Sequence, residues 1–443
     1  MATRKPRLSS TPSAAPPSPA KDSGGPKQRG GRLRALGLGL ITGAADDDCS
    51  AIGTYASAGA KFGPALLWTA PVTFPMMFTV VYLSAKLGQV SGRGLFQAIR
   101  DYLPRWVLYL TLTGVLIGNT IEAGADLGGM AAAINLFIPL PIPLIVIPVA
   151  LIILALQIWG SYILIRNIFR WLALVLLAYV AAAILAKPDA AAVLRGTFVP
   201  TLHFNRDFLS ILVAIIGTTL SAYLYTWQSN EEVEEEIAQG RTTVEQREGA
   251  TREELRHTRR DILWGMAFSN IIMYFIILST GSTLYPAGQR DIDTAAQAAQ
   301  ALRPLAGDAA GVLFAIGIIA VGFLAVPVMT AGAGYDLVQS FGWKYSLNAK
   351  FREAKGFYLS IVMVTILAVA INFLGFNPMK ALVLSGVVQG FSTPPLLLLI
   401  MLMTNNRRIM GKRVNNRWMN LLGWFTTAAI FAASVGLVAT WIM

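Results

Sequence analysis

The feature that most constrains this chain is a series of apolar runs, each about as long as a bilayer is thick. A membrane-spanning helix needs about 20 mostly apolar residues. Eleven stretches of the 443-residue sequence qualify: 34–60, 65–88, 106–136, 141–160, 168–187, 207–229, 261–285, 309–335, 357–376, 380–404 and 418–442. Only 14% of the residues are charged, against about 25% in soluble domains. The sequence therefore predicts an all-α integral membrane protein and excludes a soluble enzyme.

The basic residues fall on alternate connections between these runs. With the N-terminus in the cytoplasm, 29 of the 36 Lys and Arg residues lie on the cytoplasmic side. This asymmetry follows the positive-inside rule. It predicts a cytoplasmic N-terminus, an outside C-terminus and, for a bacterial protein, insertion in the inner membrane. It also explains the high pI of about 9.9 without a nucleic-acid partner.

Two of the eleven spans, the first and the sixth, look interrupted. Residues 37–55 carry three consecutive acids among glycines, and residues 217–228 are small and polar at their middle. Broken helices at matching positions of two halves are typical of an inverted-repeat secondary transporter. The predicted organisation begins with a disordered basic tail, 1–33. Two five-helix repeats follow, 34–187 and 207–404, and the second contains a polar cytoplasmic insert, 230–260. An eleventh helix, 418–443, ends the chain.

The three acids of the first span, Asp46, Asp47 and Asp48, are its most unusual residues. A carboxylate at the membrane centre costs at least about 2.5–3.5 kcal/mol. On a helix, three consecutive side chains point in three directions, so they do not all face one cavity. An unwound segment would add free backbone carbonyls and form an oxygen-rich site for a hard cation. We expect Asp48 to be the ligand; Asp46 and Asp47 either line the site or cap helix ends near water.

Further acids lie in the third span and after the sixth. Glu122 and Asp126 are four residues apart, so they share one helix face. Either they form a proton or ion relay, or they belong to a structural polar network. The run 231–236 contains five glutamates; we expect a solvated charged helix or loop, with a cation-attracting vestibule as the alternative. Cys49, the one cysteine, is either a soft-metal ligand or simply a small residue in the break.

The motifs of the first span resemble those of the Nramp family of divalent metal transporters. That family has Asp-Pro-Gly-Asn in a helix break, followed by a segment like Ala-Gly-Ala-Gln-Phe-Gly. Here Asp48 aligns with the family's aspartate, and Ala58-Gly59-Ala60-Lys61-Phe62-Gly63 aligns with the second segment without a gap. Asp126 and its neighbours are similar to the family's third span. The resemblance covers most of residues 34–404 and implies a LeuT-like fold with broken helices 1 and 6.

This chain departs from the family at the positions that contact the metal. The family's Pro-Gly-Asn becomes Cys49-Ser50-Ala51, and its Met-Pro-His in the sixth span becomes Ser221-Ala222-Tyr223. The acid after Asp126 becomes Gly129. This pattern of losses resembles the divergent branch of Nramp-related magnesium transporters.

The resemblance implies a secondary transporter, not an enzyme, that imports Mg²⁺ or Mn²⁺ as substrate and needs no cofactor. It implies metal contacts at Asp48, the carbonyls of Ala45 and Thr218, Ser221 and Gln389. Replacing a thioether with a hydroxyl makes the donor set all oxygen, which favours Mg²⁺. Tyr223, with a phenol in place of an imidazole, is a poor proton shuttle at neutral pH. We therefore expect proton coupling to be weak or absent.

Three other classes share some of these features. A sodium-coupled carrier of an amino acid or amine could use the same architecture, although three acids would repel a substrate carboxylate. A channel or receptor would not need paired broken helices. A membrane-embedded aspartyl hydrolase would need a second catalytic acid, and Asp126 could serve, but no diad motif accompanies it. The sequence does not fix the oligomeric state.

Overall fold

The computed structural model describes residues 38–159, 175–343 and 352–442, and within them every regular element is a helix. Among these described residues, seven helical segments are long and apolar enough to cross a membrane. They are α3 (Thr69–Ser91), α5 (Arg105–Asn135), the pair α9 (Arg206–Thr219) and α10 (Ala222–Ala238), α12 (Arg252–Thr283), α15 (Ala310–Phe341), α17 (Pro378–Thr404) and α19 (Arg417–Ile442). Three shorter apolar helices are α6 (Ile142–Trp159), the helix Val175–Leu185 and α16 (Lys355–Ile371).

The broken first span supplies α1 (Leu38–Asp46) and α2 (Cys49–Phe62). Each of the eleven predicted spans therefore overlaps a helix. Parts of the first, fourth and fifth spans, and the predicted tail 1–33, lie outside the described residues. The all-α membrane fold is confirmed. The count of eleven crossings stays a prediction, because length and composition support seven.

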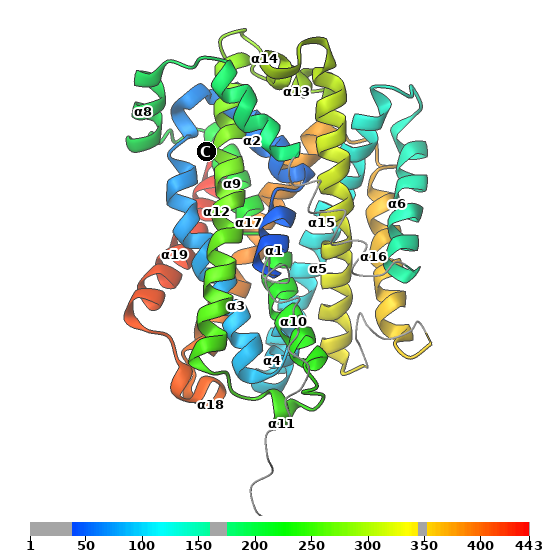
Figure 1. Ribbon diagram of the computed structural model, residues 1–443, viewed down its shortest axis with the longest axis vertical. Coiled ribbons are helices and arrows are strands. Elements are labelled where there is room, and N and C mark those ends of the chain that lie inside the picture. The colour runs from blue at the N-terminus through cyan, green and yellow to red at the C-terminus, as the bar shows by residue number, and fades with distance from the viewer. Residues whose placement is uncertain (1–37, 160–174, 344–351, 443) are drawn as a thin grey trace, which may run out of the picture. The chain divides into compact units, whose positions relative to one another are not determined.

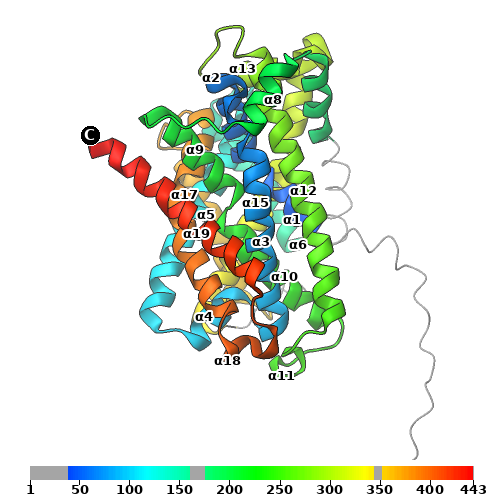
Figure 2. The same ribbon diagram turned by 90° about the vertical axis from the view of Figure 1, so that its left-hand side faces the viewer.

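Short helices mark the two ends of the bundle (Figures 1 and 2). α4 (Leu95–Tyr102), α11 (Val244–Arg247) and α18 (Arg407–Met410) lie at one end, called the α11 end below. α8 (Ala190–Phe198), α13 (Ala295–Ala299) and α14 (Arg303–Ala306) lie at the opposite end. The breaks between α1 and α2 and between α9 and α10 lie between these ends (Figure 1).

Both predicted helix breaks are confirmed. α1 ends at Asp46 and α2 begins at Cys49; Asp48 has extended backbone angles, and its side chain caps α2 by accepting from the Ala51 backbone N–H. α9 ends at Thr219 and α10 begins at Ala222. Ser221, which has extended backbone angles, is the N-cap of α10. Each break leaves a helix N-terminus and a helix C-terminus facing the middle of the bundle, which supplies both N–H donors and free carbonyls.

Glycines bring the broken helices against their neighbours. A Cβ at Gly43 of α1 would lie 2.2 Å from the carbonyl oxygen of Gly265 on α12. A Cβ at Gly217 of α9 would lie 2.0 Å from the Gly386 carbonyl oxygen on α17. Such backbone approach is common between membrane helices, where small residues allow close packing. These two crossings fix the heights of both breaks relative to α12 and α17.

The acidic stretch after the sixth span is mostly buried helix. α10 continues to Ala238 and α12 begins at Arg252, so only 239–251 lies outside these two helices. Four of the five glutamates, Glu231, Glu232, Glu234 and Glu236, are about 5% exposed. The prediction of a solvated run is therefore wrong for these four, because α3 and α15 pack against α10 and Thr258 of α12 hydrogen-bonds Glu232.

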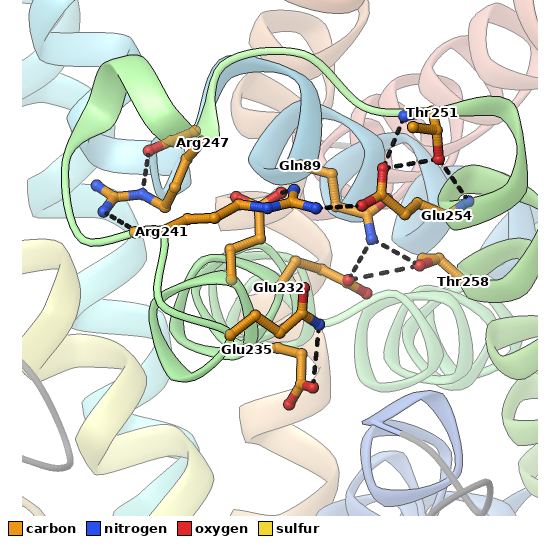
Figure 3. Close-up of polar contacts among 11 residues, drawn as sticks. Gln89, Glu232, Glu235, Arg241, Arg247, Thr251, Glu254 and Thr258 are labelled. Atoms are coloured by element: carbon orange, nitrogen blue, oxygen red, sulfur yellow. Dashed lines mark hydrogen bonds and ion pairs between the residues drawn. The ribbon is translucent and has the colours of Figure 1, made fainter. Parts of the chain in front are cut away.

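Hydrogen bonds and ion pairs link the α11 end of α10 to its neighbours (Figure 3). The Glu232 carboxylate accepts from Gln89 Nε2 at 2.7 Å and from the Thr258 hydroxyl at 3.4 Å. Arg241, in the connection to α12, bonds Glu254 at 2.5 Å, and this hydrogen bond raises the pKa of the guanidinium. The connection is therefore held against α12 by a charged group.

Candidate metal site

Asp48 lies at the junction of the two breaks. Its Oδ1 accepts from the Ala51 backbone N–H at 2.7 Å and from the Ser50 hydroxyl at 2.8 Å. Its Oδ2 lies 3.1 Å from the Tyr223 hydroxyl, which also lies 2.7 Å from the Ala45 carbonyl oxygen. The carboxylate of Asp48 and the carbonyl of Ala45 therefore meet at one phenol from α10.

Glu122 of α5 reaches the same junction. Its Oε1 lies 3.0 Å from the Ser221 hydroxyl and 3.2 Å from the Ser50 hydroxyl, and its Oε2 accepts from Gln389 Nε2 at 2.7 Å. Gln389 also donates to Asn119 Oδ1 at 3.1 Å. The carboxylate thus connects α5 to both breaks and to α17.

Asp126, one turn further along α5, accepts from the Ser50 backbone N–H at 2.9 Å. Its Oδ2 is buried and has no hydrogen-bond partner among the described residues. Asp126 therefore faces the N-terminus of α2, whose partial positive charge stabilises a carboxylate.

Ser50 lies at the centre of this network. Its hydroxyl oxygen is 2.8 Å from Asp48, 3.2 Å from Glu122 and 3.1 Å from the Thr218 hydroxyl. The carbonyl of Thr218 lies 3.0 Å from the Ser221 hydroxyl. The structure thus brings together every residue that we predicted for the site: Asp48, Ala45, Thr218, Ser221, Gln389, Glu122, Asp126 and Tyr223.

Sequence reasoning missed two members of the network. Ser50 was predicted only as a small residue replacing a family glycine, and Asn119 was not considered. Asn119 precedes Glu122 by three residues and therefore lies on the same face of α5. That spacing was a signal available in the sequence.

The junction holds three buried carboxylates without an ion-pair partner among the described residues. Asp48, Glu122 and Asp126 are each 0% exposed. All eight ion pairs found within the described residues involve other side chains, so no base there neutralises these three. A buried carboxylate without an ionic partner is strongly unfavourable unless a proton or metal ion balances it.

The donor geometry favours an ion that keeps part of its water. Among the described residues, no three Asp, Glu, His or Cys side chains converge on a single metal position. A metal ion bound here would have to use one or two carboxylates together with hydroxyls, carbonyls and water. This is the ligand set that Mg²⁺ commonly takes.

The remaining candidates of the first span face away from this junction. Asp46 and Asp47 are fully buried and contact Ser269 of α12, so neither caps a helix end in water. The Cys49 thiol donates to the Ile318 carbonyl at 3.4 Å, on α15. Cys49 is therefore a packed small residue, and its thiol hydrogen-bonds α15 and not the Asp48 carboxylate.

The broken helices and the buried acidic junction define a class: an inverted-repeat, LeuT-like membrane transporter. Solved structures with this fold agree. The Eremococcus coleocola manganese transporter superposes with a TM-score of 0.69 at 18% identity, covering 92% of this chain and 86% of that one. The structure of MhsT in complex with L-phenylalanine gives a TM-score of 0.56 at 12% identity, covering 93% and 98%.

Sequence comparison identifies the family. The model for natural resistance-associated macrophage protein-like proteins, Nramp, matches residues 39–440. The chain belongs to the Nramp family. It is 29% identical over 419 residues to a divalent metal cation transporter MntH of Bacillus subtilis, covering 92% of each chain. It is 27% identical over 413 residues to the protein of that name from Klebsiella pneumoniae, covering 92% of this chain and 94% of the relative.

Proposed function

We propose that this protein is a secondary transporter that imports Mg²⁺, Mn²⁺ or both through a bacterial inner membrane by alternating access. The observation that carries the proposal is the group of three buried carboxylates at the meeting point of two broken helices. A divalent cation supplies the missing positive charge. The names of the relatives, divalent metal cation transporters, agree with this assignment.

The proposed ion contacts are Asp48, the carbonyls of Ala45 and Thr218, Ser221 and Gln389. All of these supply oxygen, the ligand type that Mg²⁺ and Mn²⁺ accept and that soft metals do not prefer. Glu122 adds a second carboxylate, since it shares the Ser50 and Ser221 hydroxyls with the junction. The two carboxylates and retained waters together match a hydrated hard cation.

The proposed topology places the α11 end in the cytoplasm. It follows from the excess of Lys and Arg in the connections at that end, which puts the N-terminus inside and the C-terminus outside. In this arrangement, residues 34–187 and 207–404 form the two inverted repeats, and 418–443 forms an additional helix.

The proposed driving force is the membrane potential, with proton coupling weak or absent. Tyr223 hydrogen-bonds Asp48, but an unperturbed phenol titrates near pH 10, far from the working range of a proton carrier. Two positive charges moving inward gain about 4.6 kcal/mol per 100 mV, from about 2.3 kcal/mol for each charge. That gain supports uptake without protons.

The alternatives weighed on the sequence are less well supported. A substrate carboxylate would be repelled by Asp48, Glu122 and Asp126, which argues against an amino-acid carrier despite the shared fold of MhsT. An aspartyl hydrolase is excluded by family, since Nramp members are transporters.

Uptake by the purified full-length protein in liposomes tests the proposal. With a metal-sensitive dye inside, wild type should take up Mn²⁺, and excess external Mg²⁺ should compete. Asp48→Asn, which keeps the side-chain shape, should lower uptake at least about tenfold, a loss of about 1.4 kcal/mol or more. Asp308→Asn is the matched control, because Asp308 is exposed. Uptake by Asp48→Asn at the wild-type rate would contradict the assignment of this aspartate.

A further inference from the structure

A further pair of buried carboxylates, Asp46 and Asp47, lies at the first break and contacts α12. Asp46 and Asp47 are each 0% exposed. The Ser269 hydroxyl lies 2.6 Å from Asp46 Oδ2 and 3.2 Å from Asp47 Oδ1. Within the described residues, Asp46 Oδ1 and Asp47 Oδ2 have no hydrogen-bond partner. One hydroxyl supplies one proton, so two buried carboxylates share a single donor.

Close packing of α1 on α12 holds the two carboxylates in place. The backbones meet at Gly43 and Gly265, where a Cβ would lie 2.2 Å from the facing carbonyl oxygen. Ser269 follows Gly265 by one turn, and Asp46 follows Gly43 by nearly one turn. Side chains one turn apart share a helix face, so the glycine contact brings Asp46 to Ser269.

This pair is separate from the junction around Asp48. The hydrogen-bond partners of Asp48 lie on α2 and α10, whereas Ser269, the partner of Asp46 and Asp47, lies on α12. The extended backbone between α1 and α2 turns consecutive side chains toward different helices. Two groups of oxygens therefore flank one break.

Charge balance indicates what the second group binds. None of the ion pairs within the described residues involves Asp46 or Asp47. Two carboxylates and a hydroxyl form an all-oxygen donor set with two negative charges. A hard divalent cation satisfies both the charge and the unpartnered oxygens, with water completing its shell.

A series of polar side chains begins one turn before this group, at Thr42, and runs along α10 toward the α11 end. The Thr42 hydroxyl, one turn before Asp46 on α1, donates to Gln228 Oε1 at 2.6 Å. Gln228 donates to Glu232 Oε1 at 2.8 Å, and Glu232 also bonds Gln89 and Thr258 (Figure 3). Buried hydrogen bonds therefore run from Thr42, one turn before Asp46, to Gln89 and Thr258.

We propose that Asp46, Asp47 and Ser269 form a second binding station for a divalent cation, placed between Asp48 and the α11 end. The proposal rests on the proposed transport of such ions through the Asp48 junction. The two stations lie on consecutive residues, whose Cα atoms are about 3.8 Å apart. Two Mn²⁺ ions held by side chains of neighbouring residues would lie near enough to broaden each other's resonance through dipolar coupling.

Equilibrium dialysis with Mn²⁺ alone, followed by low-temperature electron paramagnetic resonance, tests the proposal on the full-length protein in nanodiscs. Wild type should bind two Mn²⁺ per chain and show spin coupling. The double variant Asp46→Asn/Asp47→Asn should bind one Mn²⁺ and lose the coupling, and so should Asp48→Asn. Glu235→Gln, an exposed control on α10, should bind two coupled ions.

Binding of one Mn²⁺ by wild type at saturation, or of two by the double variant, overturns the second station. Loss of all binding by the double variant also overturns it, because the two groups would then form one site. Ser269→Ala, which keeps all the acids, should weaken one of the two ions several-fold and leave the other unchanged. If Ser269→Ala binds each of the two ions as tightly as wild type does, the second station is contradicted. The liposome uptake assay tests the proposed function separately. The function fails if wild type takes up no Mn²⁺, or if Asp48→Asn takes it up at the wild-type rate.

Discussion

The hydroxyl of Ser221, in the break between α9 and α10, lies 3.0 Å from the Glu122 carboxylate on α5. Ser221 departs from the Met-Pro-His motif that the sixth span resembles, and Glu122 lies outside that motif. In the family motif that the sixth span resembles, the position aligned with Ser221 has a thioether, which has no proton to donate. The hydroxyl therefore lets a second carboxylate approach the break, and the site gains oxygen where it loses sulfur.

Glu122→Gln should weaken metal binding without unfolding the protein. The amide keeps the size of the side chain, but its single oxygen replaces only one carboxylate oxygen, either the Oε2 that accepts from Gln389 or the Oε1 that accepts from Ser221. It removes one of the formal charges that face the ion. We expect Mn²⁺ affinity to fall about 10–100-fold, the range found when groups that support a metal site are changed. Titration calorimetry of the purified variant measures this loss. An affinity equal to that of wild type would make Glu122 a structural residue only.

Uptake should proceed without proton movement. Liposomes with a pH-sensitive dye inside should show Mn²⁺ entry driven by an inside-negative potential, with no matching acidification. Tyr223→Phe removes the phenol that contacts Asp48 and Ala45, so it should leave the charge-to-metal ratio unchanged. Stoichiometric acidification by wild type, lost in Tyr223→Phe, would instead make this phenol part of a proton path.

Gly217→Ala should destabilise the fold at the second break. Its Cβ would lie 2.0 Å from the Gly386 carbonyl oxygen and 2.4 Å from the Gly390 amide nitrogen. Neither backbone atom can move aside alone, so α9 and α17 must separate. Such overpacking costs about 1–3 kcal/mol, and we expect a fall in Tm of several degrees in a detergent melting assay.

Gly114→Ala on α5 is the matched control for Gly217→Ala. A Cβ there meets nothing within 4 Å in the described structure. Alanine favours a helix by up to about 1 kcal/mol over glycine, so the control should melt at the wild-type temperature or slightly above it. Equal Tm values for both variants would show that the α9–α17 contact is looser than the structure has it.

The sequence predicts this site better than it predicts the surroundings of the site. Asp48 and the two breaks carry local signals, since acids and small residues interrupt apolar runs. The partners of the acids carry no such signal. Ser50 and Ser269 are ordinary serines in the sequence, and only the packing of α1 and α2 on α5 and α12 brings them to carboxylates.

The acidic end of α10 shows the same limit. Glu232 and its neighbours have the composition of a solvated helix, and hydropathy averaged along one chain predicts exposure. Burial depends on Gln89 and Thr258, which come from helices more than 20 residues away in the sequence and pair with the carboxylate only in the fold. Local pattern reveals which residues are costly to bury but not which partners offset that cost.

Ser221→Met should shift the metal preference of the site. The substitution restores a soft sulfur donor next to Glu122 and displaces the hydroxyl that lies near the carbonyls of Gly217 and Thr218. Cd²⁺ should bind more tightly, because thioethers favour soft metals. Mg²⁺ should bind more weakly, because sulfur does not replace a water in its octahedral shell at about 2.0–2.1 Å.

Ser221→Ala separates the two effects of that substitution, since it removes the hydroxyl without adding sulfur. It should weaken Mg²⁺ and leave Cd²⁺ unchanged, while Ser221→Met moves the two metals in opposite directions. Ala51 stands where the family motif has an asparagine, so Ser221→Met restores only one of the two ligands that differ from the motif. We therefore expect a modest shift in the Mg²⁺ to Cd²⁺ preference of about tenfold, or about 1.4 kcal/mol. Competition against Mn²⁺ uptake in liposomes measures it. If both variants keep the wild-type preference, the side chain at this position does not reach the ion, and the preference for Mg²⁺ must come from Glu122 and retained water alone.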